Sequence, residues 1–144
     1  MIVKNSNDLA KQLSKKTKGL SLFQATILTN AVSGKEFQNR DQLTAFFGLD
    51  IKKRQSGNWQ GKEHLSKRGN SFYRQILFQL GWSLSMNNQD YKEYYQKQKN
   101  EKQKHYYTAI IATARKFLRF FFKELKEYQK TFSKTFSFNY YKNQ

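Results

Sequence analysis

The chain has 144 residues, of which 27 are Lys or Arg and 10 are Asp or Glu, so its formal net charge is +17. A hydrophobic content of 38% and an aromatic content of 17% can supply one domain with a packed core, which excludes a disordered polycation. The excess of positive charge makes a polyanion the expected partner, with DNA or RNA ahead of an acidic membrane surface. No cysteine is present, so disulfides, thiolate zinc sites and thiol nucleophiles are excluded.

No segment is typical of secretion or of a membrane span. Residues 1–16 lack an uninterrupted apolar core, and the most apolar window, residues 108–127, carries Arg115 and Arg119 in its middle. We therefore expect a cytoplasmic protein that is associated with the nucleoid and has no membrane partner.

Three helices are predicted in the first third of the chain. Two leucines four residues apart predict a helix near residues 8–17, and the apolar pattern restarts near residues 21–32 with Ser21 as N-cap. A third helix is expected near residues 39–47, where Gly48 stops it.

The connection between the first two helices resembles a helix-hairpin-helix motif. In that motif the backbone N–H groups of a glycine-bearing hairpin contact a DNA phosphate without reading sequence. On this interpretation Lys18 and Gly19 bind DNA. Ser21 stands where a second glycine is common, so an ordinary helical hairpin with a left-handed glycine is the alternative.

The helical period disappears between residues 49 and 66. Gly57 and Gly61 flank Trp59 in this stretch, which predicts an irregular loop or a short β-hairpin with Trp59 near its tip. Such loops, held by rigid flanking elements, are frequent locations of functional residues.

Two long helices are predicted after this stretch, near residues 70–87 and 105–127, with a short helix and a turn between them. Phe72 and Trp82 are expected in the core. The predicted fold class is mostly α: a helix-hairpin-helix-like start, a basic loop or short hairpin, then long helices. We expect one domain over residues 1–128, followed by an irregular low-complexity tail at residues 129–144.

The candidate chemistry lies in residues 41–74, where Ser56 stands between two basic clusters. Such a stretch concentrates phosphate and offers a hydroxyl group to attack it. Arginine forms bidentate phosphate contacts better than lysine, which ranks the arginines first for stabilising charge on the phosphate oxygens. We assign catalytic roles to Ser56, Arg54 and Arg68, and DNA contacts to Lys52, Lys53, Lys62, Lys67 and Arg74.

Alternatives to these assignments remain open. His64 is a candidate proton acceptor, although a lone histidine is more often a surface or packing residue. Ser66 is the rival nucleophile, although its position before a helix start suits an N-cap or a phosphate contact. The nine tyrosines lack the ordered Arg and His set of a tyrosine recombinase, so we expect them to pack and stack.

Several segments, in this order and spacing, resemble the carboxyl-terminal transposase domain of the insertion sequence one-ten family, also written IS116/IS110/IS902. The matching segments are GLSLFQATIL, DQLTAFFGLD, KKRQSG, HLSKRGNSFYRQIL and TAIIATARKFLRFFF. The resemblance runs from residue 19 to about residue 126. It implies that Ser56 joins covalently to DNA.

The resemblance also implies partners. Complete enzymes of this family have an amino-terminal RuvC-like domain whose acidic residues bind magnesium, and a structured RNA guides their recombination. No metal site is predicted in this chain, because Asp50 and Glu63 are the only carboxylates near Ser56. We therefore expect DNA, a guide RNA and a RuvC-like domain in trans as partners, with an oligomer on DNA. The alternative is an inactive remnant that only binds nucleic acid.

Overall fold

The computed structural model describes the backbone of residues 2–52, 55–56, 59–60, 64–65 and 70–142, and the side chains of residues 8–51 and 70–131. The described elements are α1 (Ile2–Lys16), α2 (Leu22–Ala31), α3 (Arg40–Phe46), β1 (Ile51–Lys52), β2 (Gln55–Ser56), β3 (Trp59–Gln60), β4 (His64–Leu65), α4 (Ser71–Asn87), α5 (Gln89–Gln96), the π-helical turn η1 (Lys97–Glu101) and α6 (Tyr106–Lys142). The predicted mostly α fold is confirmed, and the strands fall within the stretch that lacks a helical period.

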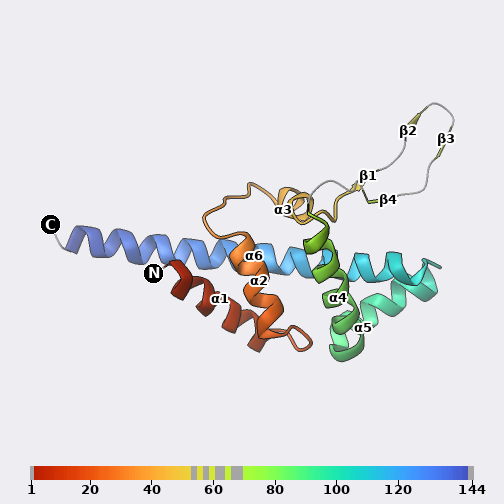
Figure 1. The fold of residues 1–144 in the computed structure, drawn as a ribbon, viewed down its shortest axis with the longest axis horizontal. Helices are drawn as coiled ribbons and strands as arrows, with labels where there is room; N and C mark the ends of the chain where they lie inside the picture. Colours follow the sequence, from red (N-terminus) through yellow and green to blue (C-terminus); the bar gives the residue numbers. More distant parts are fainter. Residues whose placement is uncertain (1, 53–54, 57–58, 61–63, 66–69, 143–144) are drawn as a thin grey trace.

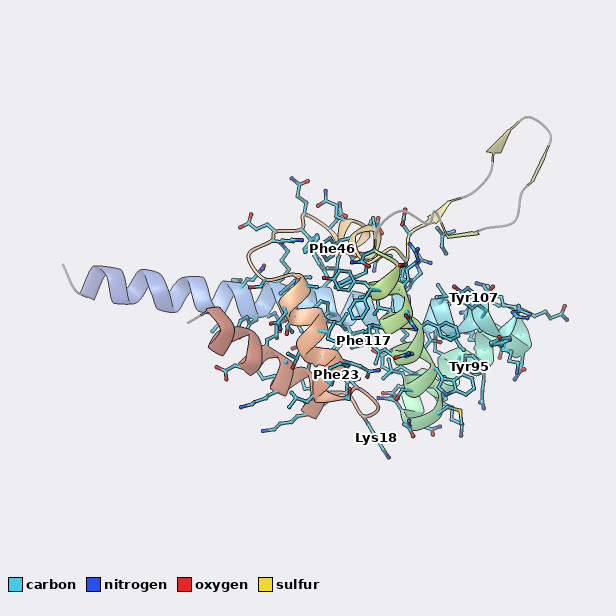
Figure 2. All side chains as sticks on the ribbon, viewed as in Figure 1. Lys18, Phe23, Phe46, Tyr95, Tyr107 and Phe117 are labelled. Carbon is cyan, nitrogen blue, oxygen red and sulfur yellow. The ribbon has the colours of Figure 1, made fainter. Side chains whose placement is uncertain are left out.

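Helix α6 is the axis on which most of the other helices pack (Figure 1). Helices α1, α3, α4 and α5 all contact it. Its apolar residues recur every three or four positions, so one stripe faces its neighbours. The fully buried members of that stripe include Ile110, Ala114, Phe117 and Phe121. Phe117 lies near the centre of the helical body (Figure 2).

Helices α4 and α6 approach each other closely at Gly81. A Cβ atom added to Gly81 would lie 2.7 Å from the carbonyl oxygen of Ile110, a distance that real Cβ atoms do not show. The missing side chain therefore lets the two helices approach each other closely. Leu77, Leu80 and Leu84 of α4 are fully buried on the same core.

Polar side chains define where several helices begin. The Ser21 hydroxyl accepts a hydrogen bond from the backbone N–H of Gln24 at 3.0 Å, and the Gln24 side chain accepts one from the Ser21 N–H at 3.2 Å. This reciprocal pair is a capping box, so the predicted N-cap is confirmed. The Asn70 and Asn88 side chains cap α4 and α5 by accepting hydrogen bonds from backbone N–H groups of the first turn.

Three local predictions are wrong. The sequence predicts an irregular segment over residues 129–142, but α6 continues through Lys142. No proline occurs in the chain and no glycine follows Gly81, so nothing in this segment stops the helix.

The side chains of Phe72 and Trp82 are each 50% exposed rather than in the core. Trp82 follows Gly81, which packs on α6, and one residue of helix turns a side chain by about 100° away from that contact.

The division of the chain at residue 128 stays a prediction.

None of the helices in the described part of the chain is long and apolar enough to cross a membrane.

Candidate nucleic-acid interface

Ser56 lies on a projecting element that we call the arm, formed by strands β1 to β4 in residues 51–65. Strand β1 pairs antiparallel with β4, and β2 pairs antiparallel with β3. Ser56 stands opposite Trp59 in the second pair. That pair lies farther from the helices than the first pair does (Figure 1). The sequence predicts an irregular loop or a short β-hairpin here, and the antiparallel strand pairs favour the hairpin.

Aromatic side chains join the two helices that flank the arm in the sequence. Phe47 caps the end of α3, and Tyr73 lies in the first turn of α4. Their ring centroids are 5.5 Å apart in an edge-on arrangement, and the Phe46 ring is 5.9 Å from that of Tyr73. Phe47 is fully buried and also contacts Phe121 of α6 at 6.3 Å. The end of α3 and the start of α4 therefore meet on the core.

Gly48 starts the turn that leads into the arm. Its φ angle is +77°, and its N–H donates to the carbonyl of Ala45 at 3.0 Å. A residue in this left-handed conformation is typical of a helix end, so the predicted stop of the third helix is confirmed.

Most of the predicted catalytic and DNA-binding residues of the arm fall outside the part of the chain that can be described. Lys53, Arg54, Lys62, Lys67 and Arg68 lie outside the described residues, as does the rival nucleophile Ser66. Convergence of these cations on Ser56 therefore stays a prediction.

Three further residues of the arm have a described backbone and no described side chain. They are Lys52, Ser56 and His64. Ser56 and His64 belong to different strand pairs, because His64 stands opposite Lys52 in the pair nearer the helices. Proton transfer from Ser56 to His64 stays a prediction. Arg74 is half-buried in the first turn of α4.

The hairpin between α1 and α2 is docked on the far end of α4. Gly19 has a φ angle of +95°, and its carbonyl accepts a hydrogen bond from the Ser83 hydroxyl at 2.7 Å. The Lys18 carbonyl accepts one from the Asn88 side chain at 2.9 Å. A Cβ atom on Gly19 would lie 3.3 Å from the Ser83 carbonyl oxygen. The left-handed glycine thus serves a close contact within the protein, as in an ordinary helical hairpin.

The Lys18 side chain is exposed and points away from the helices (Figure 2). Contact of Lys18 and Gly19 with DNA stays a prediction. The structure does not bring them close to the arm, because the arm leads into the first residue of α4 and the hairpin packs at its last turn. Helix α4 has 17 residues, which corresponds to a length of about 25 Å.

A basic cavity, which the sequence pattern does not predict, lies at the base of the arm. It has a volume of about 170 Å³ and joins Ile51 of β1 to the segment around η1 and to the first turns of α6. Its cationic side chains are Lys102, Lys104 and Arg115. No carboxylate is among its described lining residues, which also include Tyr94, Gln98, Tyr107, Thr108, Ile111 and Ala112. Ile51 and Arg115 are distant in the sequence, so spacing alone could not relate them.

Arg115 also lines a second cavity, of about 100 Å³. This cavity is lined by Arg40, Asp41 and Thr44 of α3, together with Arg115 and Arg119 of α6. Arg115 therefore lies in the walls of both cavities. Its Nε atom is buried and has no hydrogen-bond partner among the described residues.

Two tyrosines of α5, Tyr91 and Tyr94, lie close to positively charged side chains of α6. Burial raises the pKa of Tyr91 to about 12, while the positive charge of Arg119 lowers this pKa and the negative charge of Asp90 raises it. The Lys116 ammonium lies 4.7 Å from the centre of the Tyr94 ring and 5.5 Å from that of Tyr91. Lys116 is thereby held over aromatic faces by cation–π contacts.

A protein-family model matches the chain. The model of the Transposase IS116/IS110/IS902 family matches residues 12–96. The matched region is more than half of the chain and runs from α1 through the arm to the end of α5. No curated protein and no solved structure matches the chain.

Proposed function

The chain belongs to the IS116/IS110/IS902 transposase family, and on this premise we propose that it is the serine-bearing domain of a DNA transposase, with Ser56 as its nucleophile. The observation that supports this most directly is the position of Ser56. It lies on the outer strand pair of an arm between α3 and α4, which meet on the core. Basic residues flank it in the sequence on both sides.

In the proposed reaction the Ser56 oxygen attacks the phosphorus of a DNA phosphodiester. A bond between Ser56 and phosphorus forms, and the bond from phosphorus to one sugar oxygen breaks. The serine proton passes to a base, and the departing sugar oxygen takes up a proton. Arg54 and Arg68 are proposed to neutralise the charge that develops on the phosphate oxygens, which a bidentate guanidinium does well.

We further propose that this active site is completed by an acidic, RuvC-like domain in trans and by a guide RNA, as the family resemblance implies. The described residues of this chain do not fit a magnesium site, because they contain no group of three or more His, Asp or Glu side chains that could hold a metal ion. We propose that magnesium is held by the other domain, as the family resemblance implies. We place the assembly on DNA as an oligomer, in the cytoplasm at the nucleoid.

A second candidate function is an inactive, sequence-tolerant nucleic-acid-binding module. It is favoured by the small number of acidic residues close to Ser56 in the sequence, which are Asp50 and Glu63. On this alternative the net charge of +17 still binds DNA but no strand is cut.

The test is a reconstituted reaction that contains the chain, the RuvC-like domain, the guide RNA and DNA substrate. We expect a covalent protein–DNA adduct, visible as a shifted band on a denaturing gel. Ser56→Ala should abolish the adduct and retain DNA binding, because it removes the attacking atom only. Ser66→Ala is the matched control, with the same substitution in the same basic stretch, and should retain the adduct.

Two outcomes decide against this assignment. An adduct that persists in Ser56→Ala would move the nucleophile elsewhere, with Ser66 the first suspect. A wild-type chain that binds DNA and forms no adduct in the complete mixture would support the inactive binding module.

A further inference from the structure

We propose that Arg115 is the centre of a phosphate-binding site at the base of the arm. This site contacts the nucleic-acid backbone in addition to the basic stretch around Ser56. The ligand class rests on the proposed function, while the site itself rests on the two cavities that share Arg115.

The larger cavity has the composition of an anion site. Lys102, Lys104 and Arg115 bring three positive charges to a space of about 170 Å³. Like charges gathered in one cavity repel each other, and no carboxylate among its described lining residues offsets them. A bound anion removes this repulsion, so the cavity favours a negatively charged ligand.

One donor atom of Arg115 has no hydrogen-bond partner among the described residues. Its Nε atom is buried, and no hydrogen-bond acceptor in the described part of the chain reaches it. A buried donor without an acceptor is unfavourable, and a charged one more so. The planar guanidinium group matches the geometry of phosphate oxygens and can donate two parallel hydrogen bonds to them.

The second cavity indicates a ligand with more than one phosphate. Arg40 and Arg119 face it together with Arg115, against the single described carboxylate of Asp41. Because Arg115 borders both cavities, adjacent phosphates of one strand would meet a continuous series of cations. Such repeated contacts are typical of binding to the nucleic-acid backbone, which does not depend on base sequence.

The position of the larger cavity relates the phosphate site to the proposed reaction at Ser56. Ile51, the first residue of the arm, lines the larger cavity together with Arg115. A strand held there lies at the base of the element that carries Ser56. The site is therefore proposed to position the DNA, with no part in the attack on phosphorus.

The first experiment measures binding of a fluorescent DNA duplex of random sequence to the isolated chain across a series of salt concentrations. Arg115→Gln should lower affinity roughly tenfold, as expected when a charged hydrogen bond to phosphate is removed. It should also reduce the slope of log affinity against log salt by about 0.9 for each phosphate that the variant no longer neutralises.

The matched control is Lys11→Gln, which removes the same charge from an exposed position on α1 that lines neither cavity. It should leave affinity and slope nearly unchanged. Equal decreases in affinity for Arg115→Gln and Lys11→Gln would overturn the site, since net charge alone would then explain both.

A second measurement uses inorganic pyrophosphate as the probe and the thermal midpoint of unfolding as the readout. Pyrophosphate should raise the midpoint of the wild type and not that of Arg115→Gln, because a ligand of the folded state stabilises it. Stabilisation by pyrophosphate through Arg115, without duplex binding, would sustain the phosphate site and count against the DNA function. No stabilisation of the wild type and no duplex binding would overturn the site.

Circular dichroism of Arg115→Gln checks that the helices are retained. If this variant is unfolded, the double substitution of Lys102 and Lys104 by Gln is used instead. Lys102 is exposed and Lys104 is half-buried, so the double variant should fold. It should weaken duplex binding more than the double substitution of Lys11 and Lys15 by Gln, which removes the same two charges from exposed positions of α1 that line neither cavity. An effect no larger than that of this double control would overturn the proposal.

Discussion

The ring of Tyr73 meets the ring of Phe47 edge-on, with 5.5 Å between their centroids, and so joins the start of α4 to the end of α3. The arm that carries Ser56 leaves and re-enters the core on the two sides of this contact. The contact fixes the base of the arm, whatever the arm binds.

Removal of the Tyr73 ring should therefore destabilise the protein. We expect Tyr73→Ala to lower the free energy of unfolding by about 2 kcal/mol, because a half-buried aromatic side chain no longer packs against Phe46 and Phe47. Chemical denaturation measures the change. Tyr73→Phe keeps the ring and should retain most of the stability, so equal destabilisation of the two variants would contradict the role of the ring.

The close approach of α4 and α6 gives a second prediction. Gly81→Ala places a methyl group 2.7 Å from the Ile110 carbonyl oxygen and forces the helices apart. Alanine gains about 1 kcal/mol of helix propensity over glycine, but overpacking of this kind costs about 1–3 kcal/mol. We expect a net decrease of stability in thermal unfolding. Gln79→Ala, at an exposed position of the same helix, is the control, and a Gly81→Ala variant more stable than wild type would refute the contact.

The capping box at the start of α2 can be tested with two substitutions at one position. Ser21→Ala removes the acceptor of the Gln24 N–H bond and should cost about 1 kcal/mol. Ser21→Asp keeps an acceptor there and places a negative charge at the helix N-terminus, so it should be close to wild type. Urea denaturation of the three proteins distinguishes these outcomes. The cap would be unimportant if alanine and aspartate had the same effect.

The buried phenol of Tyr91 predicts a pH dependence at alkaline pH. Its pKa is raised by burial to about 12 in the folded protein, against an ordinary value of 10.0. The folded state thus holds this proton more tightly than the unfolded chain does. Its contribution to the free energy of unfolding is fully present below pH 10 and is lost as the pH rises from 10 to about 12.

Tyr91→Phe removes the ionisable group, so the decline of stability over this pH range should be shallower than in the wild type. Denaturation across a pH series measures it, and tyrosinate absorbance of the two proteins gives the titration of Tyr91 by difference. Identical pH profiles for the two proteins would show that Tyr91 does not titrate as its burial implies.

The helices could be predicted because their apolar residues follow the helical period and because Ser21 and Gly48 have clear capping roles. The exposure of Trp82 could not, since the buried face of α4 is set by the fit of Gly81 to Ile110. One part of the candidate site could likewise be predicted from the sequence and another part could not. The local charge pattern points to Ser56, whereas the cavity at Arg115 exists only because the fold brings Ile51 to α6.

The contact between Phe47 and Tyr73 has a further consequence for how this chain can change. The two aromatic residues that join α3 to α4 both lie outside the arm. The stability of the core therefore depends only weakly on the length of the arm. Doubling the length of a flexible connection costs only about 0.6 kcal/mol in loop entropy. The same helical body can therefore carry an arm of different length or sequence. Changes in the arm can alter what the protein binds while the helical fold is retained.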